Sequence, residues 1–208
     1  MPKTASAAVR LALMERAAQM LATREPVTLR ALVDGTGAST MAVYTHFGGM
    51  PGLWRAVRQE GFTRLADRLA GIEFTRDPVR DLAALGAAYA ANALANPSLY
   101  RTMFDAVVDL DDPGAAAQPF QLLVSCADRA REQKRFAATS DPEAIATRFW
   151  AAGHGLIMLV INEVLPREAL PIHAPAIATA VFVDAGDDER RCRRSVEAGW
   201  VGEGNAGK

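Results

Sequence analysis

The chain has 208 residues, of which 50% are hydrophobic and 23% charged, and its net charge is −1 at pH 7. This length allows one or two domains with a substantial core. The two cysteines, Cys126 and Cys192, lie far apart, which excludes a disulfide framework and a metal cluster with short ligand spacing.

The near-neutral total hides an asymmetry between the two parts of the chain. Residues 1–70 carry nine Lys or Arg against five Asp or Glu, a balance of +4, and the remainder carries fourteen against nineteen, a balance of −5. A positive excess favours attraction to phosphate, although such patches also occur on proteins that bind no nucleic acid. The first ten residues, MPKTASAAVR, hold no long apolar segment, so no secretory signal is predicted and we expect a reducing, cytoplasmic setting.

The first predicted element is a helix with an apolar stripe at i, i+4 spacing. The stripe consists of Val9, Leu13, Ala17 and Leu21. Residues 28–47, TLRALVDGTGASTMAVYTHF, then predict two short helices joined by a glycine turn. Thr28 and Ser39 are suited to cap the two helices, and Gly37 allows the positive φ of the turn. Leu29, Leu32, Val33 and Val43 would face inward.

The outer face of the second short helix carries hydroxyls, a thioether and an imidazole but almost no charge. These residues are Thr40, Met41, Tyr44, Thr45 and His46. Hydroxyls donate to phosphate oxygens, and apolar atoms meet thymine methyl groups. Met50-Pro51 then opens another helix, because proline is well placed in a first helical turn, and this helix continues through Leu53, Val57, Leu65 and Leu69.

This order of a bracing helix, T-x-x-x-L, G-x-S, Tyr44-x-His46-Phe47 and Leu53 resembles the TetR family of transcriptional regulators over residues 7–69. The resemblance implies that Tyr44 and His46 bind the DNA backbone and that Thr28 contacts phosphate. It also implies that Arg30 reaches a guanine and that Thr40, Met41 and Ala42 read bases, with Ser39 and Thr45 beside them. Two residues depart from the pattern. Met50 replaces the usual phosphate-pairing lysine, and Ala38 replaces a larger aliphatic residue.

Each of these residues also has an explanation that does not involve DNA. His46 is equally typical of a solvated helix end, Tyr44 of a core edge and Arg30 of an exposed surface. Met41 could simply shield the core. The family pattern as a whole, rather than any one residue, favours DNA binding.

Beyond residue 70 the chain predicts further helices, with a junction at 73–77. We expect helices over residues 78–95, 98–107, 115–133 and 142–165, and a last helical segment over 174–196. Only Val181-Phe182-Val183 has a strand-like pattern. The run DDERRCRR is expected to form a solvated face, and residues 166–175 and the glycine-rich tail after Trp200 are expected to be irregular. The apolar run GLIMLVI at 155–161 is too short for a bilayer and predicts a buried helix.

A second resemblance concerns Trp150-x-x-x-His154-Gly155, which is similar to a tryptophan-histidine-glycine signature in one class of TetR ligand-binding domains. The helix over 142–165 is apolar on more than one side, so one face would remain for a partner. By resemblance, this helix and the segment 174–196 form a homodimer interface. The expected pocket lining is apolar and aromatic, although each residue could equally be plain core: Tyr89, Met103, Phe104, Phe149, Trp150 and His154.

The sequence therefore predicts an all-α protein with a helix-turn-helix domain at 1–70 and a ligand-binding and dimerisation domain at 71–208. We expect a cytoplasmic, bacterial, dimeric repressor that binds a near-palindromic double-stranded operator and leaves it when a small, largely apolar ligand binds. No catalytic residue, cofactor or metal is expected, and His154 is the best candidate for an enzymatic base. The alternative is a helical ligand-binding or interaction protein of the same fold that has lost specific DNA binding.

Overall fold

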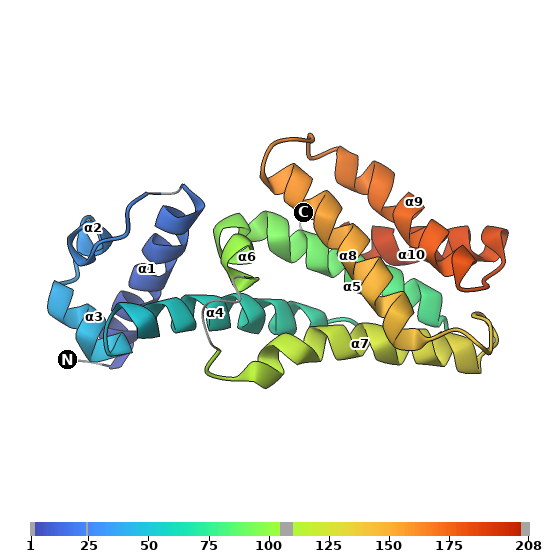
Figure 1. Cartoon of the computed structure of the whole chain (residues 1–208), viewed down its shortest axis with the longest axis horizontal. Coiled ribbons are helices and arrows are strands. Elements are labelled where there is room, and N and C mark those ends of the chain that lie inside the picture. The colour runs from blue at the N-terminus through green and yellow to red at the C-terminus, as the bar shows by residue number, and fades with distance from the viewer. Residues whose placement is uncertain (1–2, 24, 105–109, 205–208) are drawn as a thin grey trace. The chain divides into compact units, whose positions relative to one another are not determined.

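The computed structural model describes residues 3–23, 25–104 and 110–204, and these residues form helices and connecting loops with no strand. The helices of this part are α1 (Lys3–Ala22), α2 (Leu29–Val33), α3 (Thr40–Phe47), α4 (Met50–Ala70), α5 (Pro78–Ala95), α6 (Pro97–Met103), α7 (Pro113–Glu132), α8 (Pro142–Ile161), α9 (Ala169–Asp184) and α10 (Glu189–Gly204) (Figure 1). The predicted all-α fold class is confirmed.

The chain divides into two compact units. The N-terminal unit comprises Met1–Arg64 and Asn96–Ala116, and the C-terminal unit comprises Leu65–Ala95 and Ala117–Lys208. The expected division after residue 70 assigned all of 96–116 to the second domain, whereas α6 belongs to the N-terminal unit. The reason is Leu99, which is buried in the same hydrophobic cluster as residues of α1 and α4.

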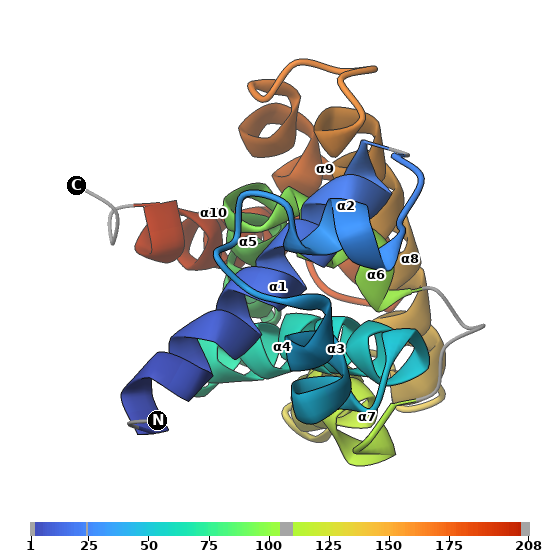
Figure 2. The same ribbon diagram turned by 90° about the vertical axis from the view of Figure 1, so that its left-hand side faces the viewer.

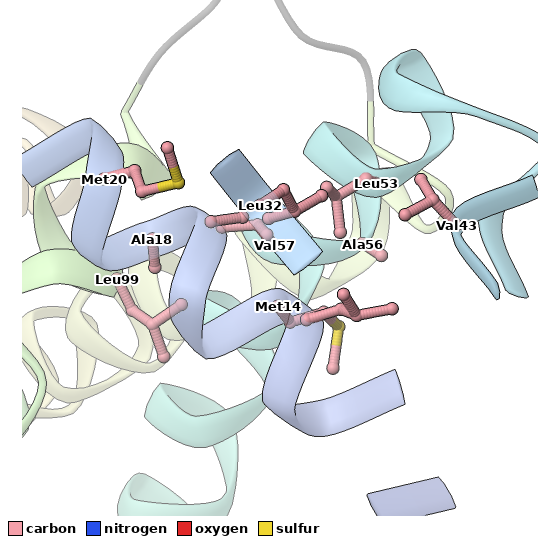
Figure 3. Packing of buried hydrophobic residues seen from close by; sticks show 11 residues of the cluster. Met14, Ala18, Met20, Leu32, Val43, Leu53, Ala56, Val57 and Leu99 are labelled. Atoms are coloured by element: carbon pink, nitrogen blue, oxygen red, sulfur yellow. The ribbon is translucent and has the colours of Figure 1, made fainter. Parts of the chain in front are cut away.

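The N-terminal unit is built around one apolar cluster, to which each of its helices contributes (Figure 3). Helix α1 supplies Leu13, Met14, Ala17, Ala18 and Met20, and the others supply Leu32, Val43, Leu53, Ala56, Val57 and Leu99. The predicted inward positions Leu13, Leu32 and Val43 are 0% exposed. Leu21 is 39% exposed, because the i, i+4 stripe drifts away from the core by the last turn of α1. Each of the short helices α2 and α3 thus has one fully buried residue, with partly buried neighbours packed beside it.

In the C-terminal unit, α10 packs along α5 and α9, and α8 packs against α9 (Figure 1). Small residues on α5 allow the close approach of α10. A Cβ on Gly199 of α10 would lie 2.2 Å from the carbonyl oxygen of Arg80 on α5, so only glycine fits there.

A buried ionic network ties the ends of these helices together. The Arg135 guanidinium donates to both carboxylate oxygens of Asp187 at 2.8 and 2.6 Å and to Asp77 at 2.8 Å. Ser195 on α10 accepts from Arg135 at 3.1 Å and donates to Asp77 at 2.6 Å. The side chain of Asp187 is 0% exposed and also accepts from Arg191 of α10 at 2.9 Å, so removing Arg135 would leave this buried carboxylate with only one, partly exposed, arginine partner.

Several sequence expectations for the C-terminal half are wrong. The strand-like Val181-Phe182-Val183 lies inside α9, where the helical spacing of Ala174, Ala178 and Phe182 buries these three side chains. Helix α8 ends at Ile161 rather than at 165, and Glu163 takes a positive φ of 61°.

The segments expected to be irregular are partly helical. Within residues 166–175, α9 begins at Ala169 and contains Pro175, and α10 continues to Gly204. The expected helix over 174–196 is interrupted at Gly186, whose φ is 112° and whose added Cβ would lie 2.8 Å from the backbone nitrogen of Ala137. The run DDERRCRR is only partly solvated, because Asp187 and Cys192 are buried. The expected end of the helix at 107 lies outside the described residues.

Among the described helices, α8 alone is long and apolar enough to cross a membrane by length and composition. Its Leu156, Ile157, Val160 and Ile161 are buried within the C-terminal unit. The run at 155–161 is thus buried as predicted, apart from Gly155 and Leu159 on the outer side of the helix.

Candidate nucleic-acid interface

Helix α2 begins at the N-cap Thr28, as the sequence predicts. The Oγ1 atom of Thr28 accepts a hydrogen bond from the backbone N–H of Ala31 at 3.2 Å. Such a cap satisfies one of the orphan donors of the first turn and leaves the hydroxyl hydrogen for another acceptor. Thr28 is exposed, so this hydrogen can be donated to a phosphate oxygen.

The turn between α2 and α3 depends on residues that the sequence reasoning missed. Gly35 takes a φ of 73° alongside the expected Gly37 at 72°. Thr36 donates its hydroxyl to the carbonyl oxygen of Val33 at 2.7 Å and accepts from the N–H of Ala38 at 3.2 Å. The T-G-A run after a first glycine was the available signal, because a threonine hydroxyl often closes a local turn.

Helix α3 turns a single fully buried residue, Val43, toward the core (Figure 3). The opposite side is open to solvent. Met41 is 67% exposed and Tyr44 is 52% exposed, and Thr40 is exposed beside them. Ala42 is half-buried. The exposed side of α3 therefore presents a thioether, a phenol and a hydroxyl.

The hydroxyls of α3 differ in how the protein uses them. Ser39 is the N-cap by position, but its side chain makes no capping hydrogen bond within the described residues. Its hydroxyl and the first N–H groups of α3 thus resemble the anion-binding arrangement common at helix N-termini. Thr45 instead donates to the carbonyl oxygen of Met41 at 3.0 Å, so its hydrogen is already committed within the helix.

The C-terminal end of α3 positions His46 and Tyr44. Gly48 caps the helix in the left-handed conformation with a φ of 71°. A Cβ on Gly49 would lie 3.7 Å from Cε1 of Tyr44, so the phenol ring lies over this glycine. His46 is half-buried, and its ring meets the edge of Phe47 with 6.1 Å between the ring centroids.

Gly52 is a further residue that the sequence reasoning missed. A Cβ at this position would lie 1.8 Å from the carbonyl oxygen of Phe47, which no rotamer change can relieve. Only glycine lets the first turn of α4 approach the end of α3 this closely. The signal in the sequence was the glycine directly after Met50-Pro51.

Arg30 and Met50 both affect the charge of this surface. Arg30 on α2 is exposed and forms no ion pair with a described carboxylate. Met50, at the start of α4, is half-buried and packs against the apolar cluster of the N-terminal unit. Ala38 packs against the same cluster, so the smaller side chain still contributes to the core.

Three of the six residues predicted to line a pocket form a hydrogen-bonded cluster in the C-terminal unit. The Nε1–H of Trp150 donates to the hydroxyl oxygen of Tyr89 at 3.1 Å, and this hydroxyl lies 3.1 Å from Nδ1 of His154. Burial lowers the pKa of His154, which favours the neutral imidazole at neutral pH. Tyr89 can then accept from Trp150 and donate to His154. Phe120 of α7 meets Trp150 edge-on with 6.1 Å between the ring centroids.

The other three predicted residues have different neighbours. Phe149 is buried in the C-terminal unit, where its ring lies 5.0 Å from that of Phe182. Met103 and Phe104 lie in the N-terminal unit. Met103 is 0% exposed and fills the space beside Gly61, where a Cβ would lie 2.3 Å from its Cγ. Phe104 packs edge-on against Tyr100 and Phe62.

A family model described as "Tetracyclin repressor-like, C-terminal domain" matches residues 82–182. The fold is also that of solved TetR regulators. One is the TetR family protein CprB from S. coelicolor A3(2), with a TM-score of 0.74 and 19% identity over 95% of this chain and 99% of that one. Residues 82–182 are thus a TetR-like C-terminal domain, and the chain as a whole has the fold of TetR regulators.

Two further solved structures share this fold. One is a receptor, and the other holds a bound ligand. A gamma-butyrolactone receptor, an ArpA-like protein, has a TM-score of 0.70 and 16% identity over 97% of this chain and 99% of that one. RolR in complex with resorcinol has a TM-score of 0.53 and 16% identity over 93% of this chain and 95% of that one. A comparison with curated proteins gives no match. Family and fold together support a DNA-binding transcriptional regulator.

Proposed function

We propose that this chain is a dimeric repressor that reads operator DNA with α3 and leaves it when a small molecule binds the C-terminal unit. The observation that carries the DNA-reading role is the exposure of α3. Helix α3 has one fully buried residue and a 67% exposed methionine, so one face of it is free, and the major groove of DNA admits an α-helix. Thr40, Met41 and Ala42 would face bases, with Ser39, Tyr44, Thr45 and His46 at the backbone.

The role of α2 follows from Thr28 and Arg30. Thr28 retains a hydroxyl hydrogen for phosphate after capping α2. Arg30 is exposed without a described carboxylate partner, so its guanidinium is available to the N7 and O6 atoms of a guanine. The two residues would hold the register of α3 and read one base pair beside it.

A second copy of the chain is the proposed partner of α8 and α9. These neighbouring helices expose apolar side chains, with Leu159 at 43% and Ile172 at 64%. Gly155 lies one turn before Leu159 and has nothing within 4 Å of an added Cβ. Glycine inside a helix costs about 1 kcal/mol relative to alanine, and no contact of the described chain offsets this cost. A closely approaching helix of a second copy would cover this face.

The Tyr89, Trp150 and His154 cluster is the proposed centre of the ligand site. Its aromatic rings favour an apolar or aromatic molecule, and its phenol and imidazole offer directional hydrogen bonds to one polar group of that molecule. Phe149, Met103 and Phe104 stay predicted lining residues. RolR binds resorcinol, which combines an aromatic ring with hydroxyl groups, and a ligand of that general chemistry suits this cluster.

The setting we propose is the reducing cytoplasm of a bacterium. Burial is the main cause that raises the pKa of Cys126 to about 11 and that of Cys192 to about 12. Both thiols therefore stay protonated near neutral pH, which makes them poor nucleophiles and metal ligands.

Selection of bound DNA from a random pool tests the proposed function. A dimer with two α3 helices should enrich a near-palindrome whose half-sites lie about 10 base pairs, one helical turn, apart or a multiple of that distance. Sedimentation of the purified complex should show at least two chains per DNA. The test variant is Leu159→Glu, which should give monomers with much weaker operator binding. The matched control is Leu21→Glu, which changes a similarly exposed leucine outside α8.

Failure to enrich any sequence at moderate salt would contradict the proposal. That outcome would favour the interaction protein of the same fold, which the loss of the usual lysine at Met50 makes chemically reasonable. A small-molecule screen by thermal shift, repeated with Tyr89→Phe, then tests the ligand site. A phenolic ligand should stabilise the unaltered protein more than the variant, and equal stabilisation would place the ligand elsewhere.

A further inference from the structure

Six arginines among the described residues of the N-terminal unit fall into two groups, and Arg101, which is half-buried on α6, belongs to neither. The arginines of the first group bind acceptors within the unit. Three of them form ion pairs: Arg16 with Glu25 at 3.2 Å, Arg55 with Asp111 at 3.4 Å, and Arg64 with Glu60 at 2.8 Å and Glu15 at 3.5 Å. Arg58 donates to the carbonyl oxygen of Met103 at 2.9 Å. The second group consists of Arg10 and Arg30, which are exposed and form no ion pair with a carboxylate of the described residues. Among the described arginines of this unit, Arg10 and Arg30 are therefore the exposed cations that no described carboxylate neutralises.

Arg10 is held beside the end of α3. Its guanidinium carbon lies 5.3 Å from the ring centroid of Phe47, the last residue of α3. Phe47 itself packs against the apolar cluster of the N-terminal unit, and its ring meets the ring of His46. A cation–π contact positions the guanidinium without neutralising its charge. Figure 2 shows α1 beside α3 in this unit, and contacts join the two helices.

Two helix ends with opposite partial charges meet at this place. The C-terminus of α3 at Phe47 carries a partial negative charge, whereas the N-terminus of α4 at Met50 carries a partial positive charge. Met50 begins α4 close in sequence to this end, but its side chain is neutral and packs into the core. Arg10 is the charged group that the structure places against Phe47.

We propose that Arg10, positioned on the ring of Phe47 beside His46, binds a backbone phosphate of the operator and supplies the charge that Met50 lacks. This inference rests on the proposed reading of DNA by α3. The site is an anion site for a phosphodiester group, contributed by α1 and the end of α3. Its contact carries no base information, so it strengthens binding equally on all sequences.

The experiment measures operator affinity against salt for the unaltered protein, R10Q, R10K and R16Q, with the sequence selected by the unaltered protein. Loss of one phosphate contact lowers the slope of log K against log salt by about 0.9. Between 50 and 200 mM salt, R10Q should therefore lose roughly threefold less affinity than the unaltered protein. R10K should keep the slope because it keeps the charge. R16Q is the matched control, since Arg16 lies on the same helix but is already paired with Glu25.

A scan of the same operator with single neutral methylphosphonate linkages locates the phosphate. One linkage should weaken binding by the unaltered protein and leave the affinity of R10Q unchanged. Equal slopes for R10Q and the unaltered protein, or equal losses for R10Q and R16Q, would overturn the role of Arg10 while leaving DNA reading by α3 intact. Absence of specific binding by the unaltered protein would instead overturn the proposed function itself. Thermal unfolding of each variant checks that the fold is kept, and R10K tests the site if R10Q is unstable.

Discussion

The two compact units use polar side chains in opposite ways. In the C-terminal unit, Asp77, Arg135, Asp187 and Ser195 satisfy one another in a largely buried network. In the N-terminal unit, the hydroxyls and cations around α2 and α3 are exposed, and Thr28, Ser39 and Arg30 keep donors for an outside acceptor. Polar groups that pair with each other stabilise a fold, whereas groups that remain open on a short, rigid motif are suited to binding.

The largest expected effect comes from breaking the buried network. Arg135→Met should lower the free energy of unfolding by about 3 kcal/mol, because the buried carboxylate of Asp187 loses one of its two arginine partners and keeps only the partly exposed Arg191. Urea denaturation measures this change. The control is Arg193→Ala, which removes an exposed ion pair with Glu189 and should cost less than about 1 kcal/mol. Similar losses for the two variants would show that the network is not what distinguishes the C-terminal unit.

Arg30→Ala tests a polar side chain of the N-terminal unit that we propose to bind DNA rather than another residue of the chain. If Arg30 reads a guanine, the variant should lose about 1–3 kcal/mol of preference at one base pair of the selected operator and keep its stability. Competition binding with single-base operator variants measures this preference. Arg16→Ala, already paired with Glu25, should leave every base preference unchanged. A uniform loss over all base pairs would instead make Arg30 a phosphate contact.

A smaller effect is expected for Thr36, whose hydroxyl forms hydrogen bonds within the N-terminal unit. Thr36→Val removes the two hydrogen bonds that close the turn between α2 and α3, which should cost about 1–2 kcal/mol of stability. Thr63→Val is the matched control, since the exposed Thr63 only bonds back to the carbonyl oxygen of Gln59 within α4. If both variants melt alike, the Thr36 hydroxyl does not hold the turn.

The smallest expected effect is a loss of stability at acidic pH. Burial alone would raise the pKa of Asp77, but the hydrogen bond from Ser195, the N–H groups of Arg80 and Val79 and the charge of Arg135 outweigh it and lower this pKa below 3.8. The resulting stability is fully present above the pKa of the unfolded chain and is lost as pH falls through the lower folded value.

Unfolding measured downward from about pH 5 should therefore show a loss of stability that begins near pH 4. Ser195→Ala should shrink this acid-dependent part by removing one of the hydrogen bonds to the carboxylate. An unchanged acid profile in Ser195→Ala would contradict this role of Asp77.

The sequence predicted the N-terminal unit better than the C-terminal one for a physical reason. Caps and glycine turns are local signals, so Thr28, Ser39 and the start of α4 lie where the pattern predicts. The strand-like run at 181–183 was misread because burial of Phe182 comes from packing across α9, which three residues do not reveal. Asp187 was assigned to solvent because its partner, Arg135, lies 52 residues away in the chain.

The candidate site shows the same difference between local signals, which the sequence reveals, and contacts between distant residues, which it does not. The exposed residues of α3 followed from helical spacing, but Gly52 and Arg10 are distinguished only by close approach in space, to the carbonyl oxygen and to the ring of Phe47. The predicted pocket residues Met103 and Phe104 lie in the other unit from Trp150, because α6 packs on the N-terminal core rather than following α5.

Selection from a random DNA pool with two variants of α3 tests the central claim most directly. If the exposed face of α3 reads bases while its end holds the backbone, exchanging Thr40 and Met41 for Gln and Arg should shift the enriched half-site at the same base positions. Tyr44→Ala should weaken binding and keep the enriched half-site unchanged. The same half-site from the exchanged α3, or a new one from Tyr44→Ala, would contradict the account.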